Sequence, residues 1–121
     1  MAVCTNKPDD SALSVLSDLE LLPYFATVLG GTCGLPRKPD PAILLEAARR
    51  LGVSAADCLM IGDALPDVAS ARGAGMAVFV LRDGYGEISS EELGADLILQ
   101  SLGELPKHLA LHRDDKLSMP A

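Results

Sequence analysis

Short apolar runs alternate with amphipathic segments along this chain of 121 residues. Apolar runs bounded by Gly, Pro or polar residues predict buried strands, and they lie at residues 1–4, 25–29, 58–61, 76–81 and 97–99. Apolar residues three and four apart predict helices between them, at residues 9–20, 41–51, 65–72 and 102–111, with one helical turn at 89–93. This alternation predicts a three-layer α/β/α fold, with a parallel Rossmann-like sheet covered by helices on both faces.

Two of the predicted helices have informative apolar faces. The helix at residues 9–20 carries Leu13, Leu16 and Leu19 on one face. The helix at residues 41–51 has an apolar stripe and clear boundary signals, because Asp40 is a good N-cap, Pro41 suits the first helical turn and Gly52 suits the end. That stripe consists of Ile43, Leu44, Ala47, Ala48 and Leu51.

Two carboxylates follow the third apolar run. The run ends in Gly62-Asp63, and Pro66 then suits the first turn of a helix that begins near Asp67. Ligands bind at the carboxyl ends of strands in open α/β sheets, and Mg²⁺ prefers oxygen ligands. The residues alone leave two interpretations open: a metal-binding pair, or a helix cap at Asp63 with a surface charge at Asp67.

Composition narrows the range of functions. The formal net charge is −7, which disfavours binding to nucleic acid or to an anionic membrane. No apolar run is long enough to span a bilayer, and residues 1–10 lack the apolar segment of a signal peptide. The cysteines, Cys4, Cys33 and Cys58, are odd in number and widely spaced, as in reduced cytosolic proteins. We therefore expect a cytoplasmic protein with one core domain at residues 1–111 and a flexible tail at residues 112–121.

Two further loops are predicted to feed the same sheet edge as Asp63. Thr5 and Asn6 follow the first apolar run, and Lys38 lies in a stiff Pro-rich turn before a helix. A hydroxyl, main-chain N–H groups, an ammonium and carboxylates together suit a phosphoryl group with a divalent cation. Taken singly, such a Thr is usually a turn former and such a Lys is usually solvated. Their order and spacing in the chain favour the phosphate interpretation.

These motifs resemble those of the haloacid dehalogenase superfamily of phosphohydrolases, especially its phosphoglycolate phosphatase-like branch. The similar segments are residues 2–7, 37–41 and 61–67 together with 71–76. The resemblance implies a Mg²⁺-dependent phosphatase acting on a small phosphorylated metabolite. It implies that Thr5 and the backbone of Asn6 bind phosphate, that Lys38 binds the phosphoryl group and acts in catalysis, and that Asp63, assisted by Asp67, holds Mg²⁺.

The sequence also departs from the family pattern. Family members begin with a strand that ends in Asp-x-Asp-Gly-Thr, whose first Asp is the nucleophile, and most carry a helical cap domain; neither is found in these 121 residues. Asp9-Asp10 and Asp114-Asp115 have the wrong spacing. We therefore expect a core without its first strand and an inactive isolated chain. The alternatives are a non-catalytic phosphate- or metal-binding module, an oligomerising interaction module, or a product with no selected function.

By the same resemblance, the absent strand would lie in the centre of the sheet, between the strands that precede Thr5 and Asp63. Unpaired edges are costly when buried. The neighbouring strands could pair directly, two chains could form a homodimer, or another chain could add a strand. Of these we expect direct closure or a homodimer.

Overall fold

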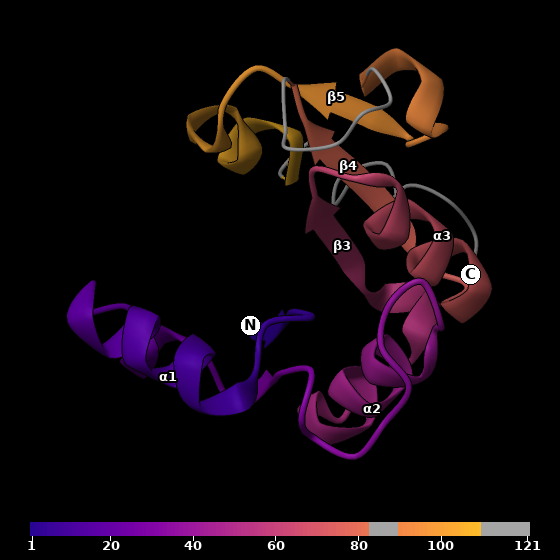
Figure 1. Cartoon of the computed structure of the whole chain (residues 1–121). Coiled ribbons are helices and arrows are strands. Elements are labelled where there is room, and N and C mark those ends of the chain that lie inside the picture. Colours follow the sequence, from indigo (N-terminus) through magenta and orange to yellow (C-terminus); the bar gives the residue numbers. More distant parts are fainter. Residues whose placement is uncertain (83–89, 110–121) are drawn as a thin grey trace.

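The computed structural model describes residues 1–82 and 90–109 (Figure 1). The strands are β1 (Ala2–Cys4), β2 (Thr27–Leu29), β3 (Leu59–Gly62), β4 (Ala77–Leu81) and β5 (Leu97–Leu99). The α-helices are α1 (Asp9–Asp18), α2 (Ala42–Leu51) and α3 (Leu65–Ala74), with 3₁₀ turns at Leu22–Tyr24, Ala55–Asp57, Ser90–Leu93 and Leu102–Glu104. The last 3₁₀ turn continues into helix at residues 105–109. The predicted tail at residues 112–121 lies outside the described residues.

All strand pairs are parallel, as the alternating pattern predicts. β1 pairs with β2, and β3, β4 and β5 form a second sheet in that order. With the helices packed on these strands, the predicted α/β fold class is confirmed. Among the described residues, no helix is long and apolar enough to cross a membrane.

The predicted direct closure of the sheet is wrong. Within the described residues β1 pairs only with β2 and β3 only with β4, so the edges of β1 and β3 that face each other are not joined. The physical reason lies in the helices: α2 packs on β1 and β2, α3 packs on β3 and β4, and the two helices pack on each other. In Figure 1, α2 and α3 connect the two sheets. These helix contacts hold the two sheets together without direct pairing of β1 and β3.

One aliphatic core joins the two sheets through these helices. Leu29 of β2, Val68 of α3 and Val80 of β4 belong to a single buried cluster. The stripe predicted on α2 contributes four further members, Ile43, Leu44, Ala47 and Ala48, while Leu51 is half-buried. Because the core is continuous, the position of β1 relative to β3 is set by packing and not by strand pairing.

The boundaries of α2 follow from local chemistry. The predicted N-cap at Asp40 and first helical residue at Pro41 are wrong by one position, because α2 begins at Ala42 and its N-cap is Pro41. The carboxylate of Asp40 still accepts a hydrogen bond of 2.9 Å from the N–H of Ala42 and supports the turn that leads into the helix. Gly52 ends the helix with φ 72°, a left-handed conformation that favours glycine.

The apolar face predicted on α1 is largely exposed. Leu13 is 41% exposed and Leu19 is 61% exposed, whereas Ala12 is buried against β2 at 5%. Leu16 is half-buried. A helix in a complete α/β layer would bury this face on the sheet. Its exposure follows from the narrow two-stranded sheet beneath α1.

Candidate functional site

Lys38 joins the two sheets at their carboxyl ends. Its ammonium Nζ donates to the carbonyl oxygen of Cys4, the last residue of β1, at 3.0 Å. It also donates to Oδ1 of Asp67 in the first turn of α3, at 2.5 Å. The two side chains of this ion pair are 10% and 9% exposed. The structure therefore brings together Lys38 and Asp67, which lie 29 residues apart in the sequence.

The second oxygen of Asp67 holds the turn between β3 and α3. Oδ2 accepts the N–H of Asp63 at 3.0 Å and the N–H of Ala64 at 3.3 Å. Burial raises the pKa of Asp67, but the hydrogen bonds from Lys38 and from these two N–H groups outweigh it and leave the pKa below its usual value. Asp67 is therefore an ionised carboxylate with both oxygens engaged.

Gly62 is required by this close approach. A Cβ on Gly62 would lie 2.4 Å from Cβ of Asp67 and 2.5 Å from its Oδ2. The sequence signal was present, because Gly62 directly precedes Asp63, but the need for glycine becomes clear only when the position of the Asp67 side chain is known.

Asp63 differs from Asp67. Asp63 is half-buried, and its N–H donates to Asp67. Its carboxylate makes no hydrogen bond or ion pair with any other residue that the structure describes. Residues 1–82 and 90–109 contain no group of three or more His, Cys, Asp or Glu that could hold a metal ion. Mg²⁺ nevertheless often binds through one or two carboxylates together with water and phosphate. Asp63 fits that kind of site better than Asp67, whose Oδ1 faces an ammonium.

Thr5 directly follows β1 and the Cys4 carbonyl that accepts the Lys38 ammonium. Its N–H continues the pairing with β2 by donating to the carbonyl of Leu29 at 3.0 Å. Its hydroxyl accepts the N–H of Lys7 at 3.1 Å, which is the turn-forming role expected of a Thr at a strand end. Because this hydroxyl accepts in that contact, its own proton is left to donate to a ligand.

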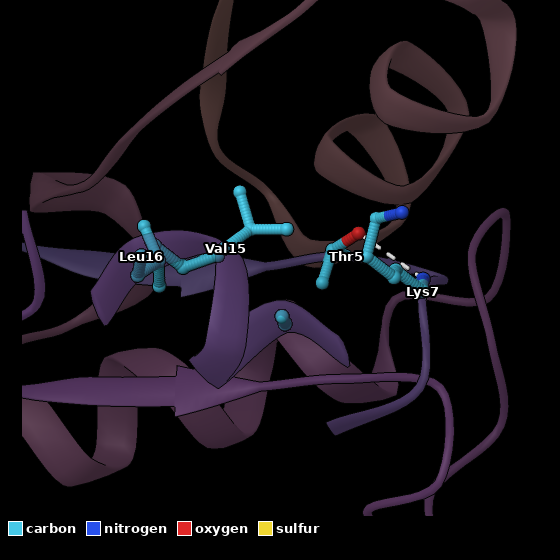
Figure 2. Close-up of a pocket in the computed structure, with 6 residues that line it drawn as sticks. Thr5, Lys7, Val15 and Leu16 are labelled. Carbon is cyan, nitrogen blue, oxygen red and sulfur yellow. Dashed lines mark hydrogen bonds between the residues drawn. The ribbon is translucent and has the colours of Figure 1, made fainter. Parts of the chain in front are cut away.

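A shallow groove of about 140 Å³ lies next to Thr5. In Figure 2, Thr5 and Lys7 lie at one end of it and Val15 and Leu16 of α1 at the other. Val3 and Ala12 complete the lining. The groove is mostly apolar and is lined by residues of β1, α1 and the turn between them, and Thr5 is the one candidate-site residue in its described lining.

Only the main chain of Asn6 was predicted to take part in the site, but its side chain contacts Lys38 directly. Its Nδ2 donates to the carbonyl of Lys38 at 3.1 Å, and its Oδ1 accepts the N–H of Lys38 at 3.0 Å. The sequence signal for this contact was weak, since one Asn in a turn has many local partners.

Cys4 supplies a carbonyl to the site but not a reactive thiol. Burial raises the pKa of its thiol to about 11, despite the opposing effect of Lys38. Its Sγ donates to the carbonyl of Ile43 at 3.8 Å. All three cysteines are free, as their spacing predicts.

Comparisons with known proteins show the family of the chain. A family model for haloacid dehalogenase-like hydrolases matches residues 1–75. The chain is 40% identical over 105 residues to a phosphoglycolate phosphatase of Rhodospirillum rubrum, covering 87% of this chain and 44% of the relative. It is 41% identical over 108 residues to one from Nitrosospira multiformis, covering 88% and 48%. The chain thus spans about half the length of these relatives.

Solved structures show the same fold. A crystal structure described as a predicted phosphoglycolate phosphatase from Haemophilus somnus superposes with a TM-score of 0.85 at 29% identity, covering 89% of this chain and 48% of that one. A haloacid dehalogenase-like protein from Agrobacterium tumefaciens superposes with a TM-score of 0.83 at 25% identity, covering 93% and 54%.

Proposed function

This chain belongs to the haloacid dehalogenase-like hydrolases, and we propose that its site binds the phosphoryl group of a small phosphorylated metabolite together with Mg²⁺. Phosphoglycolate is the first substrate to test, since phosphoglycolate phosphatases are among the relatives. The observation that carries the proposal is the nearly buried Lys38 ammonium, which is held between the end of β1 and the first turn of α3, where Asp67 also holds the N–H of Asp63.

The described residues have distinct roles in this proposal. Lys38 neutralises negative charge on the phosphoryl oxygens, while the Thr5 hydroxyl and the N–H of Asn6 donate hydrogen bonds to them. Asp63 is the carboxylate that would hold Mg²⁺, and Asp67 orients Lys38 and the turn. A direct metal contact by Asp67 stays a prediction. The metal would supply charge neutralisation at the phosphate.

The same proposal separates binding from turnover. These 121 residues contain no Asp-x-Asp-Gly-Thr motif, so no carboxylate of that type is available to attack phosphorus. We therefore expect the chain to bind inorganic phosphate without hydrolysing p-nitrophenyl phosphate or phosphoglycolate. Hydrolysis that Asp63→Asn abolishes, in a preparation free of other phosphatases, would overturn the inactive assignment.

Binding is tested by titrating inorganic phosphate into the chain in the presence of Mg²⁺ and measuring the heat. Lys38→Met should weaken binding at least about tenfold, since a hydrogen bond to a charged group contributes about 1.5–3 kcal/mol. The control is Lys107→Met, which removes an exposed ammonium outside the site. Equal affinities for the two variants would exclude Lys38 from the phosphate site.

A second function, interaction with another polypeptide strand, is favoured by the open edge of β1. The carbonyl of Met1 and the N–H of Thr5 point to β2, so alternation along a strand directs the main-chain groups of Ala2 and Cys4 to the opposite edge, where the carbonyl of Cys4 already accepts the Lys38 ammonium. Pairing there would give a homodimer or a complex with another chain. Light scattering over a series of protein concentrations tests the homodimer, and a monomer throughout would exclude it.

A cytoplasmic location is also proposed, because the free thiols of Cys4, Cys33 and Cys58 suit a reducing compartment. Fractionation of the source cells tests it, and recovery outside the cytoplasm would refute it.

A further inference from the structure

We propose that the side-chain amide of Asn6 is a positioning residue for Lys38: it fixes the main chain of Lys38 so that its ammonium reaches the phosphate site. The inference rests on the proposed function of Lys38. It goes beyond the sequence-based role of Asn6, which used only the main-chain N–H.

The first step is the geometry of the amide. Oδ1 of Asn6 accepts the N–H of Lys38 at 3.0 Å, and Nδ2 donates to the carbonyl of the same residue at 3.1 Å. A main-chain N–H only donates and a carbonyl only accepts, so the two contacts together determine which amide atom faces which. One side chain thereby satisfies both main-chain polar groups of a residue 32 positions away in the sequence.

The second step is that Lys38 is held at both of its ends by the same turn. Asn6 binds its main chain, while the carbonyl of Cys4, two residues earlier, accepts its ammonium at 3.0 Å. The same ammonium also donates to Oδ1 of Asp67. Long Lys side chains lose considerable rotamer freedom when ordered. Anchoring the main chain limits the positions that the ammonium can reach.

The third step is that Asn6 is itself held. A Cβ on Gly31 would lie 2.3 Å from the carbonyl oxygen of Asn6, so the turn after β2 packs directly on the Asn6 backbone. The N–H of Gly31 also donates to the carbonyl of Lys7 at 2.8 Å. The amide therefore projects from a supported turn, as a positioning group requires.

A neighbouring cluster provides a matched control. The hydroxyl of Thr32 donates to Oδ1 of Asp9 at 2.9 Å and accepts the N–H of Asp9 at 3.0 Å. Thr32→Val removes these two hydrogen bonds beside the same turns without touching Lys38. Asn6→Ala also removes two. If loss of hydrogen bonds only makes the region less stable, both variants should change the reactivity of Lys38. If Asn6 positions Lys38, only Asn6→Ala should change it.

The experiment measures the rate at which acetic anhydride acylates each lysine of the chain without ligand, by mass spectrometry under conditions where all variants are folded. Lys38 is nearly buried and should react slowly, and exposed Lys107 is the internal reference. Asn6→Ala should raise the ratio of the Lys38 rate to the Lys107 rate at least about fivefold, the change that corresponds to one net hydrogen bond. Thr32→Val should leave the ratio unchanged.

A second variant keeps the test decisive if Asn6→Ala does not fold. Asn6→Asp retains the acceptor for the Lys38 N–H but loses the donor to its carbonyl, so it should raise the ratio by an intermediate amount. An unchanged ratio in the folded Asn6 variants would overturn the proposal, as would an equal rise in Thr32→Val.

The dissociation constant of inorganic phosphate is measured on the same proteins with Mg²⁺ present. Asn6→Ala should weaken it about fivefold and Thr32→Val should not. If the unsubstituted chain fails to bind phosphate, the proposed function fails, while the acylation ratio still decides whether Asn6 positions Lys38.

Discussion

The ion pair between Lys38 and Asp67 should be a principal stabiliser of the joint between the two sheets. Both side chains are nearly buried, at 10% and 9% exposure, so removing one partner leaves the other poorly solvated. We predict that Lys38→Met lowers the free energy of unfolding by about 3 kcal/mol, the lower end of the range for broken buried pairs. The lower end applies because Oδ2 of Asp67 keeps its two N–H donors.

The assay is urea unfolding followed by circular dichroism, because the chain has no Trp. A loss of this size should lower the melting temperature by about 12 °C in a domain of this length, at roughly 4 °C per kcal/mol. The matched control is Arg49→Met, which breaks an exposed pair with Glu46, where Arg49 is 72% exposed, and should change stability by less than about 1 kcal/mol.

A double-mutant cycle isolates the interaction. Asp67→Asn should also destabilise the chain, but the combination Lys38→Met/Asp67→Asn should be less destabilising than the sum of the two by about 1–2 kcal/mol. Strict additivity, or a Lys38→Met loss no larger than that of Arg49→Met, would show that the pair does not join the sheets in the way described.

Three further predictions concern neighbouring groups. The pKa of Asp67 is lower in the folded chain than in the unfolded chain. The stability that the Asp67 carboxylate contributes should therefore be complete above the unfolded pKa of about 3.9 and should be lost as the pH falls through the folded pKa. Urea midpoints measured from pH 7 to pH 2 should fall more for the parent than for Asp67→Asn, and parallel curves would contradict this. Gly62→Ala should lower the free energy of unfolding by about 1–3 kcal/mol because its Cβ would overlap Asp67. Gly103→Ala, whose added Cβ would have its nearest contact at 3.5 Å, should change the free energy of unfolding by less than about 0.5 kcal/mol. Equal losses in urea unfolding would exclude the steric explanation. The thiol of Cys4, with a pKa of about 11 against an ordinary 9.0, should be alkylated by iodoacetamide at pH 8 roughly 100-fold more slowly in the folded chain than in urea; equal rates by mass spectrometry would refute its burial.

The regular elements were predictable where local chemistry decides them. The apolar stripe of α2 and its end at Gly52 depend on residues close together in the sequence, and the structure matches them. The N-cap was predicted one residue early, at Asp40 in place of Pro41. The short strands were located within a few residues, because buried parallel strands are continuous apolar runs.

The arrangement of the sheets was less predictable. Pairing of β1 with β3 depends on whether α2 and α3 can shift, and that is a property of the whole core and not of a local pattern. The exposed face of α1 has the same cause: periodicity shows which residues share a face, but not whether anything covers it.

The contacts of the candidate residues were less predictable than their places in the chain. Thr5, Lys38 and Asp63 follow or feed predicted strand ends, so the sequence could propose that they lie at one sheet edge. The direction of each side chain could not. Both oxygens of Asp67 accept hydrogen bonds, and the Asn6 amide is hydrogen-bonded to the main chain of Lys38. These contacts depend on side-chain rotamers and loop conformations that the spacing of residues in the sequence does not determine.

The most direct test of the central claim, a joint phosphate and Mg²⁺ site built on Lys38 and Asp63, is the melting temperature measured with phosphate alone, Mg²⁺ alone and both together. A ligand that binds only the folded state raises it. We predict a larger rise with both ligands than the sum of the separate rises. This extra rise should be lost in Asp63→Asn and retained in Asp18→Asn, which changes an exposed carboxylate on α1. Additive or absent shifts in the unsubstituted chain, or a joint rise that survives Asp63→Asn, would contradict it.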